Sequence, residues 1–298
     1  AVPIAITSAE LWEKNQVVSA SRSVIGLLRV AFIGLCLAAA GCSHMTAGTE
    51  LTDEESAYRQ LVAAKAGDGE AAYNVAVFYY KGGLGLPKDW DQARFWFARA
   101  AELGDADAQC DLGSRYERDA DDLFKHDVAR AKHWYEQCMF SGEASAYYSL
   151  GRMHDDDGSL QLDTEKAKYY YMRGVELQEP WSMLALGVLY AKGRNLPQDY
   201  VKAVELWERA AQKGVVVATY EIGLAHSEGK LANADNVEAL KWFSVAAETI
   251  KSEKKKMLAG YDAQRVARAL TDEQITQAKA LASQWIAQWV SKARDANR

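Results

Sequence analysis

Five segments of the chain share one pattern, and this internal repeat constrains the fold more than any other feature. In each segment a large apolar residue precedes a small one, and the small residues follow one another at steps of 37, 38, 36 and 36 residues. An aromatic residue stands 19 to 21 residues after each small residue. A period of this length is typical of solenoids built from stacked supersecondary units. The small positions are Ala76, Gly113, Gly151, Gly187 and Gly223, and the aromatics are Trp96, Trp134, Tyr170, Trp207 and Trp242.

The residues between these two landmarks predict a turn that joins two helices. In the fourth segment the turn reads KGRNLPQDY, in which Gly and Pro stop one helix and Asp199 can cap the next. In the second helix Ala203, Trp207 and Ala210 form one apolar stripe. A lone hairpin cannot bury such a stripe, so successive hairpins should stack and share a core. The sequence, with only four prolines, therefore predicts an all-α fold, an α-α superhelix or solenoid.

The repeated motif is specific enough to suggest a family. The pattern A-x-x-x-L-G-x-x-Y, a Gly-rich loop, D-x-x-K/R-A and W-[FY]-x-x-A-A-x-x-G resembles the Sel-one-like repeats, which are related to tetratricopeptide repeats. The third segment departs most, with His154 for the tyrosine and Tyr170 for the tryptophan. We expect a solenoid over residues 54–250, with repeats near 69–104, 105–142, 143–178, 179–214 and 215–250.

Residues 251–298 are expected to close the end of the solenoid. The basic run KSEKKK reads as a solvated connector, and a helical pattern begins near Thr271, which is spaced from Gln274 as in a capping box. Apolar residues then recur at helical spacing as far as Trp289. A solenoid needs an end cap, and this helix is expected to supply it.

The N-terminal residues 1–41 read as an extension followed by a signal peptide. The apolar core Val30–Ala40 is too short for a membrane span, which needs about twenty residues. The sequence AAGC that ends this segment resembles the lipobox of bacterial lipoproteins, which implies that Cys42 is lipidated and that residues 42–53 form a tether. Ala39 departs from the leucine more usual in that family. The alternative is a short apolar helix of the folded domain with an incidental cysteine.

The lipobox resemblance also implies a location. A lipoprotein of this kind would face the periplasm from the bacterial cell envelope. Ser43, in place of the aspartate that favours retention in the inner membrane, points to the outer membrane.

Cys110 and Cys138, one on each helix of the second repeat, could form a disulfide in an exported protein. If Trp134 packs opposite Gly113, the two thiols face each other. If Ala131 faces Gly113 instead, Cys110 lies about four residues, roughly 6 Å, out of alignment, which would strain or forbid the bond. The spacing leaves both a disulfide and free buried thiols open.

The resemblance implies a function in binding proteins or peptides. In related repeats the first helices line a groove that takes such partners. Several of the corresponding side chains could instead pack between adjacent hairpins. The positions expected to face the groove are Tyr73, Val77, Tyr148, Arg152, Leu184, Val188, Tyr220 and Leu224.

The sequence offers little support for catalysis. Some relatives of the family are described as β-lactamase-like, and Ser227 and Ser252 each begin an S-x-x-K match, but neither S-D-N nor K-T-G accompanies them. An exported hydrolase remains the alternative function. A secreted effector that binds host proteins is a variant of the protein-binding function. We expect no catalytic residues.

No cofactor and no metal site are expected. His126 and His133 share a helix face without a third ligand at a suitable spacing. The run from Asp155 lacks the glutamate of a calcium loop, since that position holds Lys166. The formal charge of −6 argues against nucleic acid as a partner. Contact with a membrane is expected through the lipid anchor only.

Overall fold

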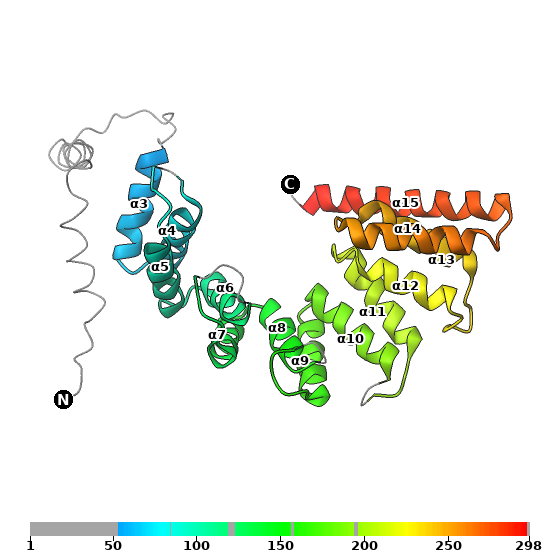
Figure 1. Cartoon of the computed structure of the whole chain (residues 1–298), viewed down its shortest axis with the longest axis horizontal. Coiled ribbons are helices and arrows are strands. Elements are labelled where there is room, and N and C mark those ends of the chain that lie inside the picture. The colour runs from blue at the N-terminus through cyan, green and yellow to red at the C-terminus, as the bar shows by residue number, and fades with distance from the viewer. Residues whose placement is uncertain (1–52, 84, 119–122, 156–157, 194–195, 297–298) are drawn as a thin grey trace. The chain divides into compact units, whose positions relative to one another are not determined.

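Thirteen α-helices make up the part of the chain described by the computed structural model, which covers residues 53–83, 85–118, 123–155, 158–193 and 196–296. These residues lie in one unit, Thr52–Arg298, and the helices succeed one another as packed pairs (Figure 1), which confirms the predicted all-α fold. The helices are α3 (Asp53–Lys65), α4 (Gly69–Lys81), α5 (Trp90–Glu102), α6 (Ala106–Glu117), α7 (Val128–Phe140), α8 (Ser145–Met153), α9 (Thr164–Glu176), α10 (Pro180–Lys192), α11 (Tyr200–Gln212), α12 (Ala218–Ser227), α13 (Asn236–Thr249), α14 (Glu253–Ala267) and α15 (Asp272–Ala296).

Each hairpin joins a first helix of even number to a second helix of odd number, from α4–α5 to α12–α13. An aspartate caps every one of these second helices, and its carboxylate accepts a hydrogen bond from a backbone N–H in the first turn. The cap satisfies an N–H group that has no partner within the helix. The capping residues are Asp89, Asp127, Asp163, Asp199 and Asp235.

In four of the five hairpins the small residue of the first helix is a glycine that lies against an aromatic ring of its own second helix. A Cβ atom added at Gly113 would stand 2.6 Å from the ring of Tyr135, and one at Gly187 would stand 2.5 Å from the indole of Trp207. The glycines therefore let the two helices approach until ring and backbone touch. The same relation holds for Gly151 with Tyr171 and for Gly223 with Phe243.

This register corrects one sequence expectation. The sequence left Trp134 or Ala131 as the residue opposite Gly113, and the ring found there is that of Tyr135. In the same way Tyr171 and Phe243 make the contact, and not the recurring aromatics Tyr170 and Trp242 that precede them. Every ring opposite a glycine stands eight residues after the aspartate that caps its helix. The distance from the cap, and not the identity of the aromatic, defines the contact.

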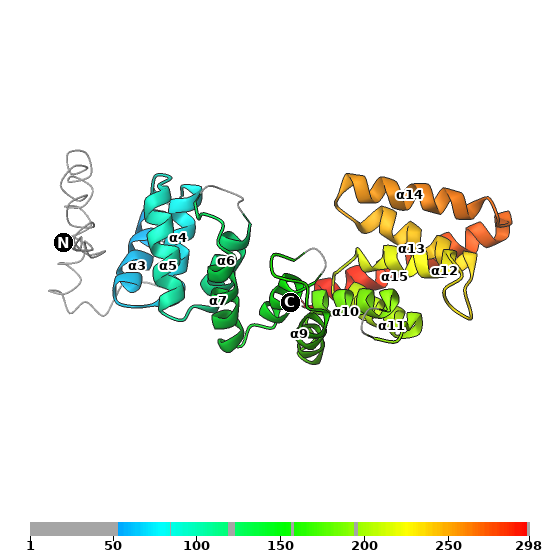
Figure 2. The ribbon, with the colours of Figure 1, turned by 60° about the horizontal axis from the view of Figure 1, so that its bottom comes forward.

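The C-terminal region contains two helices where the sequence predicted one. The lysine run lies inside α14 and is not a connector, although its side chains are exposed. α15 begins with the expected capping box, because the Thr271 N–H donates to Gln274 Oε1 (2.9 Å) and the Gln274 N–H donates to Thr271 Oγ1 (3.3 Å). Both helices pack against α13 (Figure 2).

Buried apolar side chains form a string of local clusters and not one centre. One cluster joins α3 to α6 around Phe97, another joins α9 to α13 around Trp207, and a third joins α13 to α15 around Phe243. Each helix therefore depends on its neighbours along the chain for burial of its apolar face.

Candidate interaction surface

The eight predicted groove residues occupy two positions of the repeat. Each stands either three residues before or one residue after the small residue of its first helix, as Leu184 and Val188 stand around Gly187. All eight are half-buried. In the second repeat these positions hold Cys110 and Ser114.

The tyrosines of this set use part of their surface to pack inside their own hairpins. The Tyr73 ring lies edge-on to Phe97, with ring centroids 5.7 Å apart, and Tyr148 stacks on Tyr171 at 6.2 Å. Tyr220 lies 5.5 Å from Phe243, and its hydroxyl donates to Asp262 of α14 at 2.8 Å. These residues join neighbouring helices, and the groove formed by their remaining exposed surface stays a prediction.

Trp181 adds an exposed aromatic side chain that the sequence analysis did not select. It lies in the first turn of α10 next to Pro180, is 43% exposed, and has its ring centroid 5.9 Å from that of Tyr148. A fixed aromatic ring with a free face is typical of the anchor residues at protein interfaces. The sequence could have identified Trp181 by its position, because it stands at the start of a first helix, where the other repeats have no tryptophan.

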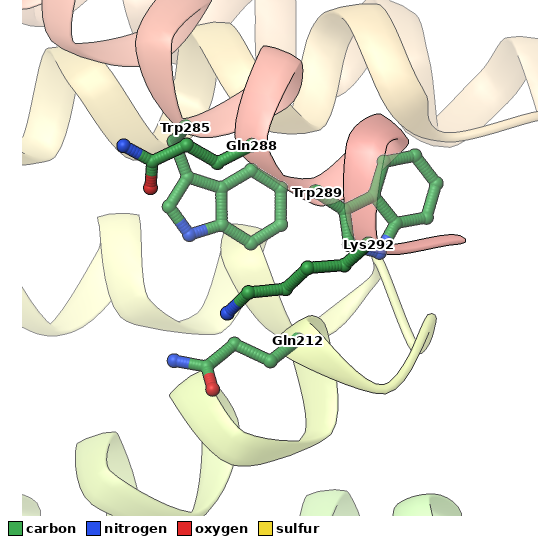
Figure 3. Close-up of a pocket in the computed structure, with 5 residues that line it drawn as sticks. All are labelled: Gln212, Trp285, Gln288, Trp289 and Lys292. Carbon is green, nitrogen blue, oxygen red and sulfur yellow. The ribbon is translucent and has the colours of Figure 1, made fainter. Parts of the chain in front are cut away.

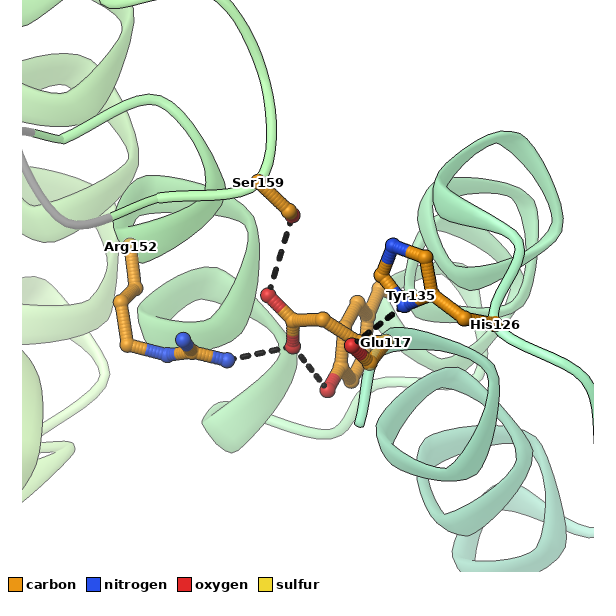
Figure 4. A network of polar contacts seen from close by, with 5 residues as sticks. All are labelled: Glu117, His126, Tyr135, Arg152 and Ser159. Carbon is orange, nitrogen blue, oxygen red and sulfur yellow. Dashed lines mark hydrogen bonds and ion pairs between the residues drawn. The ribbon is translucent and has the colours of Figure 1, made fainter. Parts of the chain in front are cut away.

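A buried carboxylate joins the second and third repeats near Tyr148. The Glu117 side chain is 4% exposed and accepts hydrogen bonds from the Tyr135 hydroxyl (3.0 Å), the Ser159 hydroxyl (3.2 Å) and the Arg152 guanidinium. The backbone carbonyl of Glu117 also contacts His126 Nδ1 at 2.9 Å. Figure 4 shows these groups converging on Glu117 from α7, α8 and two loops.

This network explains why Arg152 is only half exposed. Its guanidinium neutralises a carboxylate that burial would otherwise make costly. Burial and the Glu117 charge together raise the pKa of the Tyr135 phenol to about 12. The Tyr135 hydroxyl therefore acts as a neutral hydrogen-bond donor that holds α7 against α6.

Cys110 and Cys138 are joined by a disulfide, with their Cα atoms 5.3 Å apart. The register explains the pairing, because Cys110 stands three residues before Gly113 and Cys138 three residues after Tyr135 on the antiparallel helix. The sequence left a disulfide and free thiols open, and the structure shows the disulfide, although Tyr135 and not Trp134 lies opposite Gly113.

The serines considered for catalysis occupy local structural roles. The Ser227 hydroxyl donates to the Leu224 carbonyl at 3.2 Å, while Lys230 of the same S-x-x-K match lies 4.0 Å from Glu228. Ser252 is the N-cap residue of α14. Among the described residues no group of three His, Cys, Asp or Glu side chains could hold a metal ion.

A small cavity of about 100 Å³ lies between α15 and the end of α11. Figure 3 shows the indoles of Trp285 and Trp289 on one side, Gln212 on the other, and the Lys292 side chain reaching between them. Gln288 completes the lining. Trp285 also packs edge-on against Trp242, with centroids 5.6 Å apart, so it is part of the contact that seats α15 on α13.

The predicted anchor residue Cys42 lies outside the described residues. Within the described residues no helix is both long and apolar enough to span a membrane.

Two solved structures resemble this fold. A protective antigen present in uropathogenic Escherichia coli strains, which displays an SLR fold, superposes with a TM-score of 0.71 at 23% identity, over 80% of this chain. This chain spans 50% of the antigen. A Sel1 repeat protein from Oxalobacter formigenes superposes with a TM-score of 0.59 at 24% identity, over 67% of this chain and 78% of its own. At these identities the likeness shows the fold alone.

No curated protein matches the chain. The family model for the Sel1 repeat, however, matches it five times, at residues 69–105, 106–137, 144–177, 182–215 and 216–248. These matches cover more than half of the sequence and coincide with the helix pairs described above. The chain therefore belongs to the Sel1 repeat family.

Proposed function

We propose that this protein is a lipid-anchored scaffold of the bacterial cell envelope that binds other proteins through its first helices and catalyses no reaction. The observation that carries the proposal is the Cys110–Cys138 disulfide within a Sel1 repeat. Disulfides persist in oxidising compartments such as the periplasm and are rare in the cytosol. The bond thus supports export, which the AAGC sequence before residue 43 also suggests.

Protein binding is supported by the architecture of the described residues. Stacked helix pairs present a long row of first helices, and repeat proteins commonly use such rows to hold partners. Trp181 and Tyr148 offer ring surface, and the charge of Arg152 acts on the Tyr148 phenol, so aromatic and arginine side chains of the kind enriched at binding hot spots occur together.

The anchor is tested by intact mass and membrane partitioning of the full chain produced in a Gram-negative host. We expect wild-type protein to start at Cys42, to carry the mass of the lipid and to fractionate with membranes, whereas Cys42→Ala should lose all three properties. Cys36→Ala, which changes the other cysteine of the N-terminal segment, is the matched control and should behave as wild type. An unlipidated wild-type chain would overturn the anchor.

Partner binding is tested by placing a photo-crosslinking amino acid at Trp181 in living cells. A partner held by the first helices should yield a discrete crosslinked protein from this position. Phe140, 75% exposed at the end of the second helix α7, serves as the control position and should yield none. Equal crosslinking at both positions, or none at Trp181, would contradict the proposed surface.

A further inference from the structure

Helix α14 occupies the place of a sixth first helix, but α15, which follows it, does not pair with it as a second helix. α14 packs against α13 as a first helix does, and it carries Gly260 eight residues after its N-cap residue Ser252. Gly113 and Gly187 also stand eight residues after their N-cap residues, Asp105 and Glu179, so Gly260 corresponds to these two glycines. α15, which follows α14, packs along α13.

Gly260 differs from its equivalents in what it faces. At Gly113, Gly151, Gly187 and Gly223 an added Cβ would meet an aromatic ring within 2.7 Å. At Gly260 it would meet no described atom within 4 Å. The space beside Gly260, which in the other hairpins holds an aromatic ring, is therefore empty of described atoms. We call this space the receiving site.

The residues around Gly260 are the exposed counterparts of the predicted groove positions. Met257, three residues before Gly260, is 73% exposed, and Tyr261, one residue after it, is 65% exposed. Leu258 beside them is 48% exposed. In the other first helices the same two positions are half-buried against their own hairpins. We call Met257, Leu258, Gly260 and Tyr261 the α14 face.

Charge identifies the kind of partner that would suit this face. Exposed cations precede it at Lys254 and Lys256 and follow it at Arg268, whereas Glu253 is the exposed acid of the helix. A second copy of the chain placing its own α14 here would bring cation against cation in either direction. An acidic helix would neutralise them.

We propose that the α14 face is a docking site for an acidic amphipathic helix of a partner protein, which inserts an aromatic side chain against Gly260 and so completes a sixth hairpin. This inference deepens the proposed scaffold function by naming a partner class, and it does not depend on the lipid anchor. The partner helix would lie antiparallel to α14, as each second helix lies against its first.

A synthetic helix of this chain supplies the probe. Residues 235–249, the cap and helix of α13, carry Asp235, Glu238 and Glu248 against Lys241, and they hold Phe243, the ring that already fills a glycine site. Binding of this labelled peptide to the full chain is measured by fluorescence anisotropy. The control peptide carries Phe243→Ala.

The decisive variant is Gly260→Leu, which fills the receiving site while leaving the fold intact, because open space surrounds that position. We expect it to weaken peptide binding about tenfold or more, and the Phe243→Ala peptide to bind wild type about tenfold more weakly. Ala280→Leu, which places the same side chain at an exposed position of α15, should leave the affinity unchanged. Circular dichroism checks that both variants fold.

Four outcomes would overturn the proposal. No peptide binding to wild type, or equal binding to wild type and Gly260→Leu, would remove the docking site. Cosedimentation with anionic phospholipid vesicles that Gly260→Leu abolishes, without peptide binding, would assign the face to a membrane surface. Self-association that Gly260→Leu abolishes would assign it to a second copy. None of these outcomes alters crosslinking at Trp181, so the scaffold proposal is judged separately.

Discussion

At the scale of single residues, the repeat depends on glycines in the first helices that leave room for an aromatic ring of the second helix. Glycine at the contact position costs helix stability in isolation, by about 1 kcal/mol relative to alanine. The cost is offset because the missing side chain lets a large ring contact the facing helix over most of its surface. Gly187 and Gly260 separate the helix cost from the gain in ring contact, because only Gly187 faces an aromatic ring.

Gly187→Ala and Gly260→Ala should therefore change stability in opposite directions. The Cβ at residue 187 would stand 2.5 Å from the Trp207 indole, and the resulting displacement should cost about 1–3 kcal/mol. At residue 260 alanine should stabilise the helix by about 0.5–1 kcal/mol. Urea unfolding followed by circular dichroism measures both. A shift in the same direction for both variants would contradict the role assigned to the ring.

Ionisation of the Tyr135 phenol should lower the stability of the folded protein at alkaline pH. Its pKa is raised from the ordinary 10 to about 12 in the folded protein, first by burial and then by Glu117. A group with a raised pKa in the folded state contributes stability that is complete below pH 10 and is lost as the pH rises towards 12. Two pH units correspond to about 2–3 kcal/mol of unfolding free energy.

The test compares the unfolding free energy at pH 8.5 and 11.5 in wild type, Tyr135→Phe and Tyr261→Phe. Tyr135→Phe loses a hydrogen bond and should be less stable at pH 8.5, but its stability should fall less steeply with pH. Tyr261→Phe changes a tyrosine that is exposed on α14 and is the matched control. It should leave the slope of the unfolding free energy against pH as in wild type. An unchanged slope in Tyr135→Phe would show that its ionisation does not limit alkaline stability.

The sequence showed that small residues and aromatics recur at fixed positions of the repeat, but it did not predict which aromatic contacts each glycine. Trp134 and Tyr135 are adjacent, and adjacent residues on a helix differ in direction by about 100°. Apolar periodicity cannot distinguish two such neighbours when both are large and neither is exposed. The distance from the capping Asp127 distinguishes them once the cap is known.

At the scale of helices, three of the junctions between neighbouring helix pairs are held by contacts of different kinds. Arg152 of α8 reaches back to Glu117, Trp181 of α10 meets Tyr148, and Tyr220 of α12 donates to Asp262. Because these contacts do not recur at one repeat position, periodicity could not predict them. It did predict the hairpins, whose glycines and capping aspartates do recur.

The disulfide adds a covalent link between the two helices of one hairpin. It closes a loop across a sequence separation of 28 residues, and a link of that length is worth about 3 kcal/mol. We expect Cys110→Ala/Cys138→Ala to increase amide hydrogen exchange in α6 and α7 while leaving α10 and α11 nearly unchanged. The same pattern should appear in wild type treated with a reductant. Uniform loosening of all helices would contradict a stabilisation confined to the hairpin.

At the scale of the described chain, stability should behave as a sum over neighbouring hairpins, because the buried clusters follow one another along the chain. A terminal repeat has only one neighbour, and here α15 supplies the second contact by covering α13. The Trp285 indole joins the two, as it packs on Trp242 and borders the cluster around Trp207.

Trp285→Ala should therefore loosen one end of the described chain and spare the other. Truncating this half-buried indole should cost about 2 kcal/mol locally and raise hydrogen exchange in α11, α13 and α15. Exchange in α4 and α5 should stay as in wild type, because those helices share no cluster with Trp285. Trp90→Ala, at a 43% exposed position in α5, is the matched control and should leave α13 unaffected. If Trp285→Ala instead destabilised every helix to the same extent, the described residues would unfold as one cooperative unit, and stability could not be assigned to hairpins and their neighbours.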